Sequence, residues 1–284
     1  MDGLDAVGVG PPTLGRSLPE YVALYWRLVG ARARSQLQYK VSFALLVIGS
    51  ALNLLVDLGE ILVFFRFIRS LAGWSLPEVA LLYGFSSSSF AIAEALAMGF
   101  DQFHRNVVHG TFDRTLVRPL GAFFQTFASD LGVRRVGRVG QGLLVLGIAA
   151  AWLGVDWTPD RAAMLVVTLA SGTTIFFSFF VIGAASSFWT VQANEVVNIF
   201  THGGSFITAY PADVLTSWLR RFVTFVVPLA FINYYPTLYI LGRSDPLGLP
   251  DWVRLLSPVA AIAMVLAART VWSLGVRRYQ STGS

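Results

Sequence analysis

The side chains that could carry chemistry in this sequence are few, and most of them lie inside apolar runs. Asn53, Asp57 and Glu60 fall within one run, at spacings that place all three on one face of a helix. Glu94 lies near the end of the next run. Because acidic side chains inside a bilayer are costly and usually face protein or water, these four residues are candidates for lining a cargo pathway. The alternative is a structural role, in which they pair with arginines that flank the runs.

Enzymatic and metal-binding chemistry has little support in the residue types. The sequence contains no cysteine, and its three histidines, His104, His109 and His202, show no metal-ligand spacing. The serine run 86–89 lacks the glycines of a nucleophile elbow. The single lysine, Lys40, follows a tyrosine, so no phosphate-binding loop is present. We expect no catalytic residue, metal or cofactor on this chain, and any ATP-driven process would need a separate ATPase.

The composition indicates a membrane protein. The chain has 284 residues, of which 55% are hydrophobic and 13% charged, and its mean hydropathy is +0.63. Apolar runs near the length that crosses a hydrocarbon core of about 30 Å recur along it. The formal net charge of +5 comes from arginines placed between these runs, where they set topology. We therefore expect membrane lipid around the chain and no nucleic-acid partner.

The order of the runs predicts an all-α polytopic membrane protein with about six transmembrane helices. Residues 1–17 read as a disordered tail, residues 18–40 as an interfacial helix and residues 41–279 as a single transmembrane domain. The expected spans are residues 41–65, 78–100, 137–155, 162–189 and 252–274, together with one span between residues 196 and 241. On the positive-inside rule both termini are cytoplasmic.

The most basic loop, residues 101–137, predicts a docking element on the cytoplasmic face. Gly110 permits a turn, Thr111 can cap a helix, and Pro119 ends it. Between them, apolar and polar residues alternate at helical spacing: Phe112, Leu116 and Val117 against Asp113, Arg114 and Arg118. The helix is too polar to cross a bilayer and too short to fold alone. An ordinary interfacial loop helix is the alternative.

At these residues the chain resembles the permeases of type-2 ATP-binding-cassette exporters, and more closely a bacterial subgroup encoded with an ATPase and a second permease. The first matching patch is Gly110, Thr111, Phe112, Asp113, Leu116, Arg118, Pro119 and Leu120. The second patch contains Tyr210-Pro211, then Pro228 through Ile232, then Tyr235-Pro236. With the order of the apolar runs, the resemblance covers about residues 18–279. These motifs identify the family and say little about cargo.

The resemblance implies how the part of the chain containing Tyr210, Pro211, Pro228 and Pro236 folds. Hydropathy alone makes residues 222–241 the fifth span. In the family the fifth span precedes the Tyr-Pro motif, and the proline-broken segment forms a re-entrant hairpin in the outer leaflet. A hairpin of this kind is tolerated only where protein buries it. We favour the hairpin, because two prolines suit a bent helix pair better than one straight span.

The resemblance also implies a function and its partners. The chain would be the transmembrane subunit of an exporter in the bacterial cytoplasmic membrane, with spans one, two and five lining the pathway. It would pair with a sister permease or a second copy of itself and with two ATPase copies, which hold the ATP and Mg²⁺. The ATPase would grip the helix at residues 110–120, with Phe112 and Leu116 as buried anchors. The alternatives are an ion-coupled secondary transporter using Asp57, Glu60 and Glu94, and a non-transporting membrane anchor or assembly factor.

Overall fold

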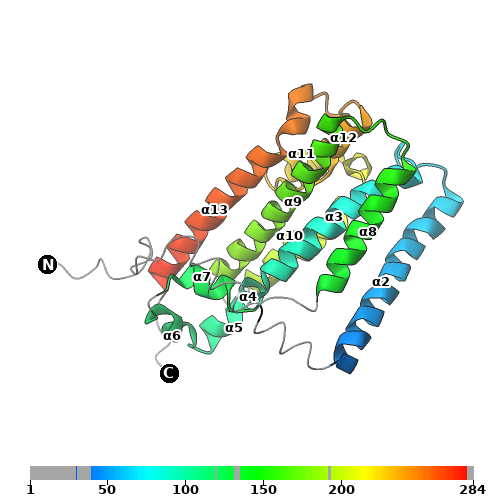
Figure 1. Ribbon diagram of the computed structural model, residues 1–284. Coiled ribbons are helices and arrows are strands. Elements are labelled where there is room, and N and C mark those ends of the chain that lie inside the picture. The colour runs from blue at the N-terminus through cyan, green and yellow to red at the C-terminus, as the bar shows by residue number, and fades with distance from the viewer. Residues whose placement is uncertain (1–29, 31–39, 119, 131–134, 191–192, 280–284) are drawn as a thin grey trace.

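The molecule is a bundle of long helices with short helices at both ends (Figure 1). The computed structural model describes residues 30, 40–118, 120–130, 135–190 and 193–279, and these residues form helices joined by loops, without a β-sheet. The long helices are α2 (Lys40–Phe67), α3 (Leu76–Leu96), α8 (Val136–Trp152), α9 (Pro159–Ser186) and α13 (Ser257–Arg278). The predicted tail and interfacial helix lie outside the described residues.

Several of these helices are suited to a bilayer, so the chain is a multi-pass membrane protein. Within the described residues α3, α9 and α13 are long and apolar enough to cross, and a bent helix pair gives a fourth candidate. Helix α8 is apolar but has 17 residues, which span about 26 Å at a rise of about 1.5 Å per residue. Each predicted run up to residue 189, and the last one, coincides with a helix. Their ends differ by several residues. Helix α3, for example, stops at Leu96, and four short helices separate it from α8.

Helix α3 lies at the centre of the bundle, between α8 and α9 (Figure 1). Close approach explains the small residues expected along it. A Cβ atom added at Gly84 would lie 2.7 Å from the Leu146 Cα, and one at Gly142 would lie 2.8 Å from the Ser88 nitrogen. The backbones of α3 and α8 therefore touch where only glycine fits, which is the packing that small residues permit in membrane helices.

The segment between α10 (Ala193–Thr208) and α13 is bent rather than straight. Helix α11 (Ser217–Phe225) and the helical pair η3 (Leu229–Phe231) and α12 (Tyr234–Leu241) meet at 73°, as in a broken span or a re-entrant loop. The reading of residues 222–241 as one straight span is therefore wrong. Pro228 lies at the break, whereas Pro236 lies in the first turn of α12, where proline is tolerated, and does not bend the chain.

Buried polar contacts hold the bent segment against the bundle. The Asn233 side chain donates hydrogen bonds to the Leu82 carbonyl of α3 at 2.9 Å and to the Thr208 carbonyl of α10 at 2.5 Å. Asp213, in the short helix η2 (Ala212–Val214), accepts hydrogen bonds from Trp74 Nε1 at 2.6 Å and from the Tyr234 hydroxyl at 3.1 Å. Most residues from Val227 to Ile240 are buried, so protein surrounds this part of the segment, as a membrane requires, whereas Phe225 and Val226 at the bend are exposed.

Candidate functional site

The first candidate site is α6 (Phe112–Leu116), one of the short helices that gather at the end of the bundle where α13 ends (Figure 1). Gly110 precedes it with a φ of 65°, a left-handed conformation that favours glycine, so the predicted turn is present. The predicted capping role of Thr111 is wrong. Its backbone is already helical, with φ −71° and ψ −13°, and its hydroxyl donates to the Asn106 carbonyl at 3.3 Å.

Phe112 fixes α6 to the bundle. Its side chain is 1% exposed, and its ring centroid lies 5.1 Å from that of Phe103, 5.3 Å from Phe188 and 5.0 Å from Tyr279. Phe103 and Phe188 in turn contact Trp272 of α13. The expectation that Phe112 anchors a partner is therefore wrong, because the residue is buried in its own chain. An amphipathic pattern predicts that an apolar residue is covered and leaves open which molecule covers it.

The carboxyl end of α6 is exposed. Leu116 is 38% and Val117 84% exposed, and both are flanked by the exposed arginines Arg114 and Arg118. An apolar centre with a basic rim is the composition of a protein interface. Pro119 lies outside the described residues.

Two contacts hold the ends of α6. Gln125 of α7 (Ala122–Phe127) donates to the Thr115 carbonyl at 2.8 Å and to the Leu120 carbonyl at 2.5 Å. On the other side, partial burial and the neighbouring Asp113 carboxylate raise the pKa of the Tyr279 phenol to about 12. The phenol therefore stays neutral beside Asp113 at physiological pH. Helix α6 is thus tied both to α7 and to the residue that follows α13.

The second candidate site is a cluster of charges around Glu94, near the end of α3. The Glu94 carboxylate is 1% exposed and forms ion pairs with Arg135 and, at 2.9 Å, with Arg138 of α8. His202 Nε2 of α10 lies 3.6 Å from the same carboxylate. Burial and the nearby Glu94 raise the pKa of Asp101 above its ordinary value. Of the two roles expected for Glu94, the structure shows pairing with arginines of the basic loop and α8.

A polar cavity of about 360 Å³ adjoins this cluster. Four helices line it, α2, α3, α8 and α10, so that the predicted first, second and fifth elements meet there. The polar residues on its wall are Glu60, Ser86, Ser87, Arg138, Gln141, His202 and Ser205. A polar hollow among membrane helices is a place where water or a polar cargo group is tolerated.

The structure places the other predicted site residues as follows. Glu60 and Tyr210 both line the polar cavity, and Glu60 is exposed. Pro211 is buried. The side chains of Asn53 and Asp57 lie outside those that the structure describes. Sequence reasoning missed the contributions of Arg138 and His202. Arg138 carried a signal as an arginine at the start of an apolar run, but its pairing with Glu94 and the place of His202 beside them depend on three helices that are distant in sequence.

Comparison with known proteins gives one match. A family model described as ABC-2 family transporter protein matches residues 51–283, which is most of the chain and includes both candidate sites. Neither the curated proteins nor the solved structures give a match. Among the described residues, no group of three or more histidine, aspartate or glutamate side chains is arranged to hold a metal ion.

Proposed function

Because the chain belongs to the ABC-2 family of transporter proteins, we propose that it is the exporter subunit that forms the substrate pathway and that a separate ATPase drives it by docking on α6. Membership of this family makes the chain a membrane component of an ABC transporter and implies an ATPase partner. The direction of transport and the docking position are the proposal. ATP and Mg²⁺ would be held by the partner, since no phosphate-binding loop exists here.

The observation that supports α6 as the docking element is that its first residue is buried whereas its carboxyl end is exposed. Phe112 is packed into a cluster of aromatic rings that reaches Phe177 of α9 and Trp272 of α13, whereas Leu116 and Val117 are exposed at the end of the bundle. Protein interiors are close-packed and transmit displacement. A partner that moves the exposed carboxyl end of α6 would therefore move the two long helices with it.

The polar cavity between α2, α3, α8 and α10 is the proposed segment of the pathway. A complete pathway needs a second permease, either a sister subunit or another copy of this chain. The outward side of α2 is suited to that contact, because it exposes a row of large apolar residues: Leu45, Ile48, Leu52, Val56, Leu62 and Val63. An ion-coupled mechanism at Glu94 is disfavoured, since that carboxylate is already occupied by two arginines.

The docking proposal is tested by introducing charges at the exposed carboxyl end of α6. We expect the double variant Leu116→Asp, Val117→Asp to insert and fold normally, because neither side chain is buried. It should copurify with the cognate ATPase at a level reduced by about tenfold or more, since apolar interface centres tolerate charge poorly. The measurement is copurification with the ATPase encoded beside the permease, followed by ATPase activity in nanodiscs.

Val214→Asp is the matched control. Val214 is 44% exposed but lies in η2, next to Asp213, which contacts Trp74 before α3 and Tyr234 of α12 and is thus far from α6. This variant should retain the ATPase at the wild-type level. Wild-type recovery and activity of the complex with the double variant would contradict docking at α6. If no ATPase copurifies with the wild-type chain either, the membrane-anchor alternative is supported instead.

A further inference from the structure

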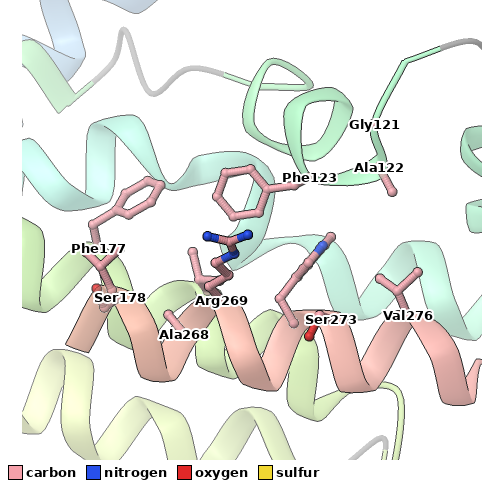
Figure 2. Close-up of a pocket in the computed structure, with 12 residues that line it drawn as sticks. Gly121, Ala122, Phe123, Phe177, Ser178, Ala268, Arg269, Ser273 and Val276 are labelled. Atoms are coloured by element: carbon pink, nitrogen blue, oxygen red, sulfur yellow. The ribbon is translucent and has the colours of Figure 1, made fainter. Parts of the chain in front are cut away.

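A groove on the α13 side of the bundle contains an arginine without a counter-charge. The groove has a volume of about 400 Å³, within the range of roughly 300–1,000 Å³ typical of small-molecule sites. Helices α7, α9 and α13 line it, and Figure 2 shows Arg269 directed across it toward Phe123 of α7. The remainder of the wall is largely apolar, with Phe177, Val265 and Trp272 among its members.

Arg269 is unusual for its position. It is the only charged residue of α13 before Arg277, which lies about 12 Å further along the helix at a rise of about 1.5 Å per residue. Within the part of the chain that the structure describes, Arg269 forms no ion pair or hydrogen bond. A guanidinium inside a membrane segment is costly unless it meets water or an anion. A ligand that supplies the anion would remove this cost.

The surroundings of the groove indicate lipid rather than protein. Helix α13 forms the edge of the bundle opposite α2, so it lies away from the proposed contact between permeases (Figure 1). Its outward side exposes Val259, Ile262, Val265, Leu266 and Leu274, each more than two-fifths exposed. A single helix face of this kind is what acyl chains cover in a multi-pass protein. The groove therefore opens toward the bilayer.

We propose that the groove binds one anionic phospholipid, with its phosphate on the Arg269 guanidinium and an acyl chain along Phe177 and Trp272. Arginine is suited to this role because its planar guanidinium forms two parallel hydrogen bonds with phosphate oxygens. The apolar wall supplies the remainder of the affinity by contact with the chain. Helix α7 borders the site, so a bound lipid would contact the element to which Gln125 ties α6.

The test is native mass spectrometry of the purified chain in detergent, titrated with phosphatidylglycerol and with phosphatidylcholine of the same acyl chains. Wild-type protein should retain one phosphatidylglycerol molecule more tightly than phosphatidylcholine. Arg269→Leu should weaken the phosphatidylglycerol affinity by about tenfold or more and abolish the preference, since a charge-assisted hydrogen bond is lost. Arg269→Lys should retain part of the preference for phosphatidylglycerol, because lysine keeps the positive charge. Ser273→Trp keeps the charge but fills the groove, and should also weaken binding.

Arg277→Leu is the matched control, because Arg277 is exposed on the same helix but does not line the groove. It should leave the preference within about twofold of wild type. An unchanged preference in Arg269→Leu, or an equal loss in Arg277→Leu, would overturn the proposal. So would loss of assembly with a second permease in Arg269→Leu while lipid binding stays normal. The site is independent of docking at α6: the Leu116→Asp, Val117→Asp variant should bind lipid as wild type does.

Discussion

Glu94 shows how the energetics of a single residue bear on the function of the chain. A carboxylate that is 1% exposed among membrane helices is compatible with folding only if its charge is compensated. Arg135 and Arg138 provide this compensation, and both belong to the region where the basic loop enters α8. The cluster therefore joins α3, α8 and α10 beside the polar cavity. Its first effect is structural, and its second is to set the charge of the cavity wall.

This assignment predicts that Glu94→Ala destabilises the protein strongly. The expected cost is about 1.5–3 kcal/mol, less than for a pair buried on both sides, because the arginines left behind are 26% and 39% exposed and stay partly hydrated. The expected result is a clear fall in melting temperature, measured by intrinsic fluorescence in detergent. Glu60→Ala is the control, since Glu60 lines the same cavity but is exposed, and its melting temperature should change little. Equal melting temperatures for the two variants would show that the ion pairs around Glu94 do not support the fold.

The residues also show where sequence reasoning succeeds and where it stops. The turn at Gly110 and the apolar runs could be predicted because each depends only on residues that are close together in the sequence. The burial of Phe112 and the partners of Glu94 are tertiary facts. An amphipathic pattern predicts that its apolar residues are covered, and an acid within a membrane helix predicts that a cation lies near it. Neither pattern says which residue or which molecule does so. Arg269 stands out in the sequence as an arginine within an apolar run. The groove beside it is formed by three helices that are distant in sequence, so it could not be predicted.

At the scale of elements, the contact between α3 and α8 positions both candidate sites. Helix α8 carries Arg138 toward Glu94, and α3 continues through α4 (Met98–Asp101) and α5 (Phe103–Val108) into the turn before α6. Membrane helices associate by close packing rather than by hydrophobic burial, so the glycine contacts between α3 and α8 determine how near the charged groups come.

Two glycines of α8 allow a matched test of this contact. Gly142→Ala should destabilise the protein, since the new Cβ atom would lie 2.8 Å from the Ser88 nitrogen and the two helices would have to separate. Gly147→Ala should be neutral or stabilising by up to about 1 kcal/mol, because nothing lies within 4 Å of that position and alanine favours helix. The measurement is the melting temperature of both variants. Changes of the same sign and size would show that the helices do not touch at Gly142.

At the scale of the whole molecule, the charges differ between the two ends. Near α6 the exposed cations are Arg105, Arg114, Arg118, Arg277 and Arg278. At the other end Arg66, Arg69 and Arg221 are exposed as well, while three further arginines pair with acids: Arg220 with Asp213, Arg243 with Glu78, and Arg254 with Asp251. The most basic loop of the sequence, residues 101–137, contains α6, so the positive-inside rule predicts that the α6 end faces the cytoplasm. Docking of an ATPase at α6 requires that orientation, because ATP is available only on that side.

The absence of cysteine makes this orientation directly measurable. Arg114→Cys and Ser244→Cys each introduce one exposed thiol, at opposite ends of the bundle. In intact cells a membrane-impermeant maleimide should label Ser244→Cys and leave Arg114→Cys unlabelled, whereas permeabilised cells should label both. The unsubstituted chain has no thiol and supplies the background. Labelling of Arg114→Cys in intact cells would place α6 on the outer face of the membrane. Docking of an ATPase at α6 would then be ruled out, even if an ATPase copurified with the chain.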